Sequence, residues 1–138
     1  MRTPAALVCL VAATWLHLGF QGTVTLLVYP ALRRVGPDDW RIAHERHSRT
    51  ITPVVAVVYL GLVATLTWCL VAQPSTAVVV STMGALLSVG VTAALAAPLH
   101  ARLGDAYEPT LLGRLVRVDR IRLVGALIGA AAALVALR

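Results

Sequence analysis

The sequence predicts an all-α integral membrane protein in which four helices form one bundle. Of its 138 residues, 59% are hydrophobic and only 13% are charged. A soluble domain of this size could not bury so many apolar side chains. The apolar residues also fall into four long runs, and about 20 apolar residues cross the hydrocarbon of a bilayer as a helix with its backbone groups paired internally. We therefore expect a single four-span domain over residues 1–138, with the lipid bilayer as its solvent.

The first run extends from about Ala5 to Val28. It is too long for the apolar core of a signal peptide, so we expect a retained helix. Its polar residues share one face at spacings of three and four; they are Thr14, His17, Gln21 and Thr25. An ionisable group such as His17 near the middle of a span is costly and often functional. It is either an imidazole bonded to a neighbouring helix, with Gln21 as a plausible partner, or a ligand or proton relay.

The stretch after the first run is polar. Tyr29 and Pro30 are expected to end the first helix, since tyrosine favours the membrane interface and proline cannot continue the hydrogen-bond ladder. After a turn at Gly36, the spacing predicts a short interfacial helix from Asp38 to about Thr50. Several of its polar residues fall on or beside one stripe; they are Trp40, His44, His47, Ser48 and Thr52.

The second run covers about Ile51 to Ala72. A straight helix from Asp38 to its end would measure roughly 50 Å, so either it bends near Thr52 or its first turns project into water. The third run covers about Thr76 to Ala97, and Pro98 is expected to close it. Its polar residues again keep to multiples of four; they are Ser88, Thr92 and His100.

The fourth run, from about Val116 to Leu137, opens with charged residues; they are Arg117, Asp119, Arg120 and Arg122. Beyond them Gly125, Gly129 and Ala133 recur every four residues, a pattern that lets helix backbones approach closely. Packing inside the bundle is the expected use of this face. The alternative is a homo-oligomer that assembles through Gly125 and Gly129.

Ten of the twelve arginines lie in the first loop or between the third loop and the start of the fourth helix, and none lies in the second loop. One more lies at each terminus, Arg2 and Arg138. The positive-inside rule then places both arginine-rich loops in the cytoplasm and both termini outside, in a multi-pass protein of the bacterial plasma (inner) membrane. The net charge of +6 does not indicate nucleic-acid binding, because the charges cluster between apolar runs without interleaved aromatics.

Three histidines are expected near the cytoplasmic membrane surface, where they could form a metal site. His44 and His47, three residues apart, can ligate one ion from a single helix face, and His100 would be the third ligand. Glu45 or Asp119 would complete the coordination shell.

Two other uses of the histidines stay open. Haem would need axial ligands on neighbouring helices, and His17 lies roughly 18 Å deeper than the loop histidines, so a haem would use only part of the set. In metal-free acid–base chemistry, a histidine removes a proton from an acidic lipophilic substrate, and arginines, with Arg122 the expected partner, steady the anion. The structural alternative is that these groups bind anionic lipid headgroups. The cofactor is therefore open between haem, a transition metal and none.

Three short motifs lie at the ends of the predicted helices; they are Tyr29, Pro30 and Leu32, then Trp40 and His44, then Pro98, Leu99, His100 and Leu103. In this pattern the chain resembles the small four-helix membrane proteins related to anthrone oxygenases. In those relatives the fourth helix often opens with Asn-Trp-Ile-Arg, and here only Ile121 and Arg122 of the matching stretch agree. The resemblance implies oxidation of a lipophilic aromatic, such as an anthrone or a reduced quinone, and is compatible with catalysis without a cofactor. A fainter similarity to four-helix membrane protoporphyrinogen oxidases associates a first-helix histidine, comparable to His17, with haem.

We therefore predict an oxidoreductase or oxygenase that acts on a lipophilic aromatic or quinone-like small molecule in a pocket open to the cytoplasmic face. The expected working residues are His44, His47, His100 and Arg122, with His17 as a buried relay or second-site ligand. The competing hypothesis is a non-enzymatic membrane subunit or small transporter that assembles through the small-residue face of the fourth helix.

Overall fold

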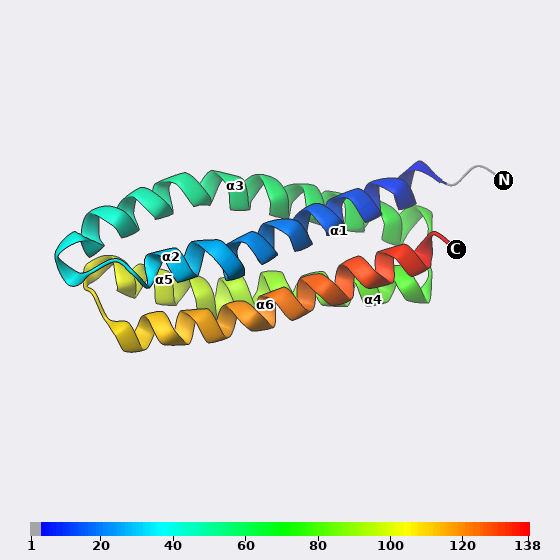
Figure 1. The fold of residues 1–138 in the computed structure, drawn as a ribbon. Coiled ribbons are helices and arrows are strands. Elements are labelled where there is room, and N and C mark those ends of the chain that lie inside the picture. Colours follow the sequence, from blue (N-terminus) through cyan, green and yellow to red (C-terminus); the bar gives the residue numbers. More distant parts are fainter. Residues whose placement is uncertain (1–3) are drawn as a thin grey trace.

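The computed structural model describes residues 4–138, which are helical almost throughout and contain no strand, so the predicted all-α class is confirmed. Four helical rods lie side by side (Figure 1). The elements in chain order are α1 (Ala5–Thr23), the π-helical turn η1 (Val24–Val28), α2 (Tyr29–Leu32), α3 (Pro37–Ala72), α4 (Thr76–Val91), the π-helical turn η2 (Thr92–Ala96), α5 (Ala97–Asp105) and α6 (Pro109–Ala136). Arg2, which enters the topology prediction, lies outside the described residues.

Three of the rods are long and apolar enough to cross a membrane; they are Ala5–Leu32, Pro37–Ala72 and Thr76–Asp105. The fourth predicted span, within α6, is not among them. Charged residues occupy its first half, and the uncharged part from Leu123 to Ala136 is only about 20 Å long, shorter than the hydrocarbon core.

Two helices continue past the prolines at which the sequence predicted them to stop. Pro30 and Pro98 each lie two residues after a π-helical turn. Proline lacks an N–H, and its ring crowds the carbonyl four residues earlier. The wider π turn accommodates this defect without ending the helix. His100 consequently lies in a helix, and the third loop, expected over residues 99–115, shrinks to residues 106–108.

The predicted interfacial helix and second span form one continuous helix, α3, of 36 residues. At 1.5 Å per residue it is about 54 Å long. Pro53 lies within it without ending it, and the helix arches along the whole bundle in Figure 1. Its first turns pack against α5, which brings His44 and His47 to the rod that carries His100.

The small-residue face of α6 packs inside the chain, against α4. A Cβ built on Gly84 would lie 2.6 Å from the backbone nitrogen of Gly129 and 2.7 Å from the carbonyl oxygen of Gly125. The hydroxyl of Ser81 donates a hydrogen bond to the Gly129 carbonyl oxygen at 2.9 Å. Both α6 glycines are buried. A helix of the same chain covers both glycines, as expected for packing inside the bundle, and this arrangement gives no support to an oligomer through Gly125 and Gly129.

The two ends of the bundle differ in character. Both termini and the α3–α4 connection lie at one end, and the α2–α3 and α5–α6 connections lie at the other (Figure 1). One apolar cluster, around Leu10 and Leu62, packs toward the first end. A second, around Trp40, Leu103 and Leu111, packs toward the other. Several buried polar side chains lie between the two clusters, among them His17, Gln21, Asp119 and Arg122.

Candidate functional site

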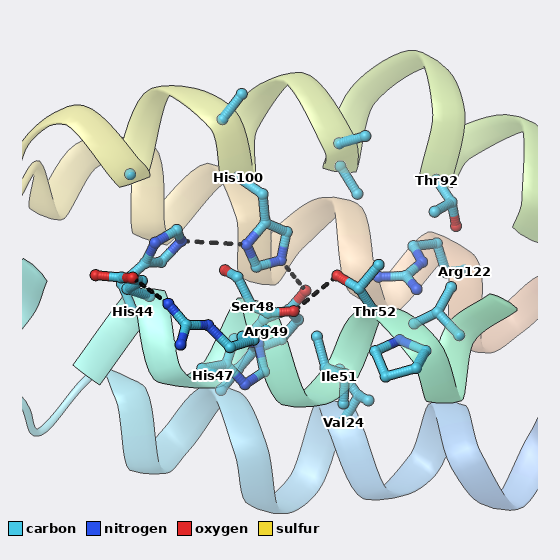
Figure 2. A pocket seen from close by; sticks show the side chains of 18 of the residues that line it. Val24, His44, His47, Ser48, Arg49, Ile51, Thr52, Thr92, His100 and Arg122 are labelled. Carbon is cyan, nitrogen blue, oxygen red and sulfur yellow. Dashed lines mark hydrogen bonds and ion pairs between the residues drawn. The ribbon is translucent and has the colours of Figure 1, made fainter. Parts of the chain in front are cut away.

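A cavity of about 970 Å³ opens between the rods in the half of the bundle that carries the arginines (Figure 2). Four predicted site residues line it; they are His44, His47, His100 and Arg122. Its other inner walls are mainly apolar, with Phe20, Val24, Ile51, Val55 and Ala96 among them. Exposed Arg41, Glu45 and Arg49 lie at its rim. The size and the mixture of apolar walls with a few polar groups are typical of sites for small organic ligands.

The imidazole of His100 is the centre of a chain of polar contacts. Its Nε2 lies 3.1 Å from the Tyr29 hydroxyl, and its Nδ1 lies 3.4 Å from Nε2 of His44. The ring of His47 lies alongside, with 5.9 Å between the ring centroids. A neutral imidazole has one N–H donor and one acceptor nitrogen. The chain Tyr29–His100–His44 is therefore consistent with hydrogen bonds that run in either direction, which is the property that a proton relay requires.

Trp40 holds His44 in this position. The indole stacks on the imidazole with 5.3 Å between the ring centroids, and its Nε1 donates a hydrogen bond to the carbonyl oxygen of Leu103 at 2.8 Å. Trp40 and His44 are both buried, as expected for neighbours one helical turn apart on a single stripe. Trp40 thus links α3 to α5 and sets the orientation of the His44 imidazole in the cavity.

The predicted metal site acquires no carboxylate ligand in this arrangement. Among residues 4–138, no three His, Cys, Asp or Glu side chains are placed to hold one metal ion. Glu45 pairs with Arg49 one turn away at the surface. Asp119 points to α1 and not to the histidines. The three imidazoles do meet, but as a hydrogen-bonded and stacked group.

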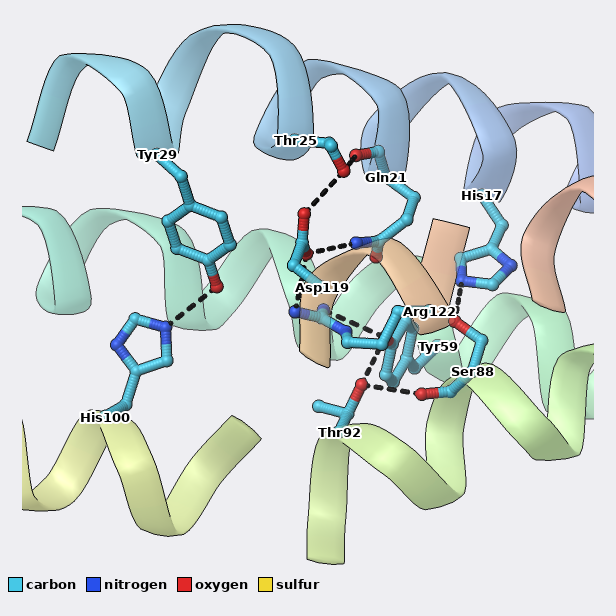
Figure 3. A network of polar contacts seen from close by, with 10 residues as sticks. All are labelled: His17, Gln21, Thr25, Tyr29, Tyr59, Ser88, Thr92, His100, Asp119 and Arg122. Carbon is cyan, nitrogen blue, oxygen red and sulfur yellow. Dashed lines mark hydrogen bonds and ion pairs between the residues drawn. The ribbon is translucent and has the colours of Figure 1, made fainter. Parts of the chain in front are cut away.

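Asp119 and Arg122 form a buried ion pair at the inner end of the cavity (Figure 3). The carboxylate is 0% exposed and the arginine 4%, and Nη1 lies 3.1 Å from Oδ1. The carboxylate also accepts hydrogen bonds from Nε2 of Gln21 and the hydroxyl of Thr25. Burying a charge is costly unless it is paired and hydrogen-bonded, and Asp119 satisfies both conditions. It binds α6 to α1.

Arg122 reaches from this pair toward α3 and the cavity. Its Nη2 donates to the Tyr59 hydroxyl at 3.3 Å, and that hydroxyl lies 2.8 Å from Oγ1 of Thr92. The Nε of Arg122 is buried and has no hydrogen-bond partner within the described chain. Buried N–H groups are normally satisfied by protein, water or ligand. Arg122 also lines the cavity with part of its side chain, so its guanidinium charge lies close to a molecule bound there.

His17 does not line this cavity. It is buried, its Nε2 lies 3.2 Å from the Ser88 hydroxyl, and its ring meets the ring of Tyr59 edge to face at 5.4 Å between centroids. The expected partner Gln21 binds Asp119 instead. His17 thus bonds to a neighbouring helix, one of the two uses that the sequence left open.

Sequence reasoning missed the part played by two tyrosines. Tyr29 was expected to be an interfacial anchor, yet it is buried and contacts His100. Tyr59, inside the second apolar run, was not considered, although it links Arg122 to Thr92. A phenol within an otherwise apolar span is a usable signal, because a buried hydroxyl usually finds a partner.

The all-helical fold and the three rods long and apolar enough to cross a bilayer are typical of an α-helical membrane protein, here with a cavity between the helices that combines apolar walls with a few polar groups. Comparisons with family models, with curated proteins and with solved structures find no match. The resemblance to proteins related to anthrone oxygenases therefore stays a prediction.

Proposed function

We propose that the chain spans the bacterial plasma membrane four times, with both termini outside and the arginine-rich end in the cytoplasm. The charges of α6 support its placement as the fourth span, because Asp119 and Arg122 are buried and neutralise each other. From there on, α6 exposes a row of large apolar side chains; they are Ile121, Val124, Leu127 and Ile128. The exposed arginines in the first half of α6 have long side chains that can extend to the membrane–water interface.

This topology predicts where reporter fusions are active. Alkaline phosphatase fused after Arg138 should be active because it is exported, whereas the same enzyme inserted at Gly36 or Ala106 should be inactive. A cytoplasmic reporter at these three sites should give the reverse pattern. Active phosphatase at Gly36 would contradict the orientation.

We further propose that the cavity binds a lipophilic hydroxyaromatic or quinone-like molecule and catalyses its oxidation. The observation that carries this proposal is that a chain of phenol and imidazoles and a buried arginine line one cavity whose other inner walls are mainly apolar. The apolar walls suit an aromatic body, and the polar groups suit its oxygen atoms.

The chemistry follows from these positions. The Tyr29–His100–His44 chain removes a proton from an acidic O–H or C–H of the substrate, with His100 exchanging one of its two contacts for the substrate, and the remaining contacts allow that proton to move on. The guanidinium charge of Arg122 stabilises the oxygen on which negative charge develops. For a substrate with an activated CH₂ group, the carbanion then reduces dioxygen, a hydroperoxide forms at that carbon, and loss of one water leaves a ketone. Dioxygen is the oxidant, and the balance is CH₂ plus O₂ to C=O plus H₂O.

The test is dioxygen uptake by the detergent-purified protein with an anthrone as probe. The His100→Gln variant should lower the rate by about 10²-fold, the lower part of the range for loss of a general base. Arg46→Gln is a control, because Arg46 is exposed on the same helix as His44 and does not line the cavity. It should keep the rate of the unchanged protein.

Two outcomes would overturn the oxidation proposal. One is a His100→Gln variant that consumes dioxygen as fast as the unchanged protein. The other is an unchanged protein that binds anthrone without consuming dioxygen, the result expected of a small transporter that uses the same cavity. The subunit alternative is supported less, because α4 covers Gly125 and Gly129, the face through which such a subunit was expected to assemble.

A further inference from the structure

A second hollow, of about 500 Å³, lies between the rod of α4, η2 and α5 and the adjoining face of α6. It shares no lining residue with the imidazole cavity. Leu95 and Pro98 form one wall and Val118 and Ile121 the other. Leu95 and Ile121 are each nearly half exposed, so the hollow is an open groove on the outside of the bundle.

Two arginines line the same groove. Arg114 and Arg117 lie three residues apart on α6, so their side chains share one face. Both are exposed. The ion pairs formed within residues 4–138 use Arg49 and Arg122, which leaves the charges of Arg114 and Arg117 unpaired. The nearby acid on α6, Asp119, is buried and directed to α1. The groove therefore carries two uncompensated positive charges.

Charge and apolar surface are ordered along the groove. On α6 the arginines come first, nearest the α5–α6 connection, and Val118 and Ile121 follow toward the middle of the bundle. The opposite rod runs the other way, so Leu99 lies nearer the arginine-rich end than Leu95. From Arg114 to Ile121 the groove extends about 10 Å along the helix. It is cationic at the end assigned to the cytoplasm and aliphatic toward the membrane interior.

We infer that this groove binds one anionic phospholipid of the cytoplasmic leaflet. The phosphate lies between Arg114 and Arg117, and the upper methylenes of an acyl chain lie over Pro98, Leu95 and Ile121. Basic pockets between transmembrane helices at the cytoplasmic side are suited to anionic headgroups. The inference rests on the proposed membrane placement and is independent of the chemistry proposed for the imidazole cavity.

The experiment compares two double variants in detergent, with lipid retention measured by native mass spectrometry and by titration with phosphatidylglycerol. Arg114→Gln with Arg117→Gln removes the two groove charges. Arg33→Gln with Arg34→Gln removes two exposed arginines from the same end of the bundle, outside the groove. At about 1 kcal/mol for each arginine, the groove variant should bind phosphatidylglycerol roughly 30-fold more weakly. The control should bind it like the unchanged protein.

Further ligands show which parts of the phospholipid the groove recognises. Phosphatidylcholine should bind poorly to all forms, and glycerophosphoglycerol or inorganic phosphate, which lack acyl chains, should not displace the bound lipid. Equal weakening in both double variants would overturn the inference, because surface charge alone would then explain binding. Displacement by the chain-free headgroup would also overturn it, because the aliphatic groove would then contribute nothing. Unchanged helical content and thermal midpoint of the groove variant would exclude unfolding as the cause.

Discussion

Replacing Asp119 by alanine is expected to destabilise the protein by about 3–5 kcal/mol, the cost of breaking a buried ion pair by removal of one partner. Arg122 is 4% exposed, and without the carboxylate its charge stays buried with a neutral partner, the Tyr59 hydroxyl, in place of a charged one. The side-chain amide of Gln21 and the hydroxyl of Thr25 lose their acceptor in the same step. Three buried or partly buried polar side chains therefore lose a hydrogen-bond partner in a single substitution.

The midpoint of thermal unfolding in a single detergent measures this effect, with circular dichroism as the probe. The double variant Asp119→Ala, Arg122→Leu should be more stable than Asp119→Ala alone, because it removes both charges and fills the space with an apolar side chain. Glu45→Ala serves as the control, since it breaks an exposed pair that contributes little. If Asp119→Ala unfolds at the same temperature as Glu45→Ala, neither the buried pair nor the hydrogen bonds of Asp119 to Gln21 and Thr25 stabilise the fold.

A single methyl group at Gly84 is expected to force α4 and α6 apart. The Cβ of Gly84→Ala would lie 2.6 and 2.7 Å from backbone atoms of α6, and backbone cannot move aside as the end of a flexible side chain can. Overpacking of a close-packed interior costs roughly 1–3 kcal/mol. Because this contact joins two helix backbones, we expect the upper end of that range or more, and Gly84→Val should be worse.

Gly90→Ala is the matched control for this variant. Gly90 lies in the same helix, and nothing lies within 4 Å of the position of its Cβ. This variant should be as stable as the unchanged protein or slightly more stable, since alanine is the better helix former by about 1 kcal/mol. The measurement is the thermal midpoint of each variant in the same detergent. If Gly84→Ala and Gly90→Ala have the same midpoint, the close approach of α4 and α6 is wrong.

The two predictions concern contacts that also shape the imidazole cavity. The α4–α6 contact sets the position of the rod that carries His100, and the ion pair holds the side chain of Arg122, which lines the cavity. Loss of either contact should therefore lower dioxygen uptake along with stability. His100→Gln should lower the rate with a much smaller change in thermal midpoint, which separates a catalytic defect from a structural one.

Much of the site could be predicted from the sequence. Four of the five candidate residues line one cavity; they are His44, His47, His100 and Arg122. They could be predicted because they are polar residues in or beside apolar runs, where such residues are scarce. The partners could not be predicted. Gln21 was paired with His17 and Asp119 with a metal ion, whereas in the structure these two bind each other. The rotation of each helix about its axis decides such contacts, and a spacing of three or four residues does not specify it.

The sequence by itself determined the helical class, the apolar character of the rods and the identity of the rare polar side chains, because these depend on composition and periodicity along one dimension. Only the tertiary structure decided that Pro30 and Pro98 are accommodated by π turns, which place Tyr29 and His100 in continuous helices. It also decided that Gly125 and Gly129 face α4 of the same chain. The physical reason is that each outcome depends on the register and separation of rods distant in sequence, and these follow from backbone contacts such as that of Gly84 with α6.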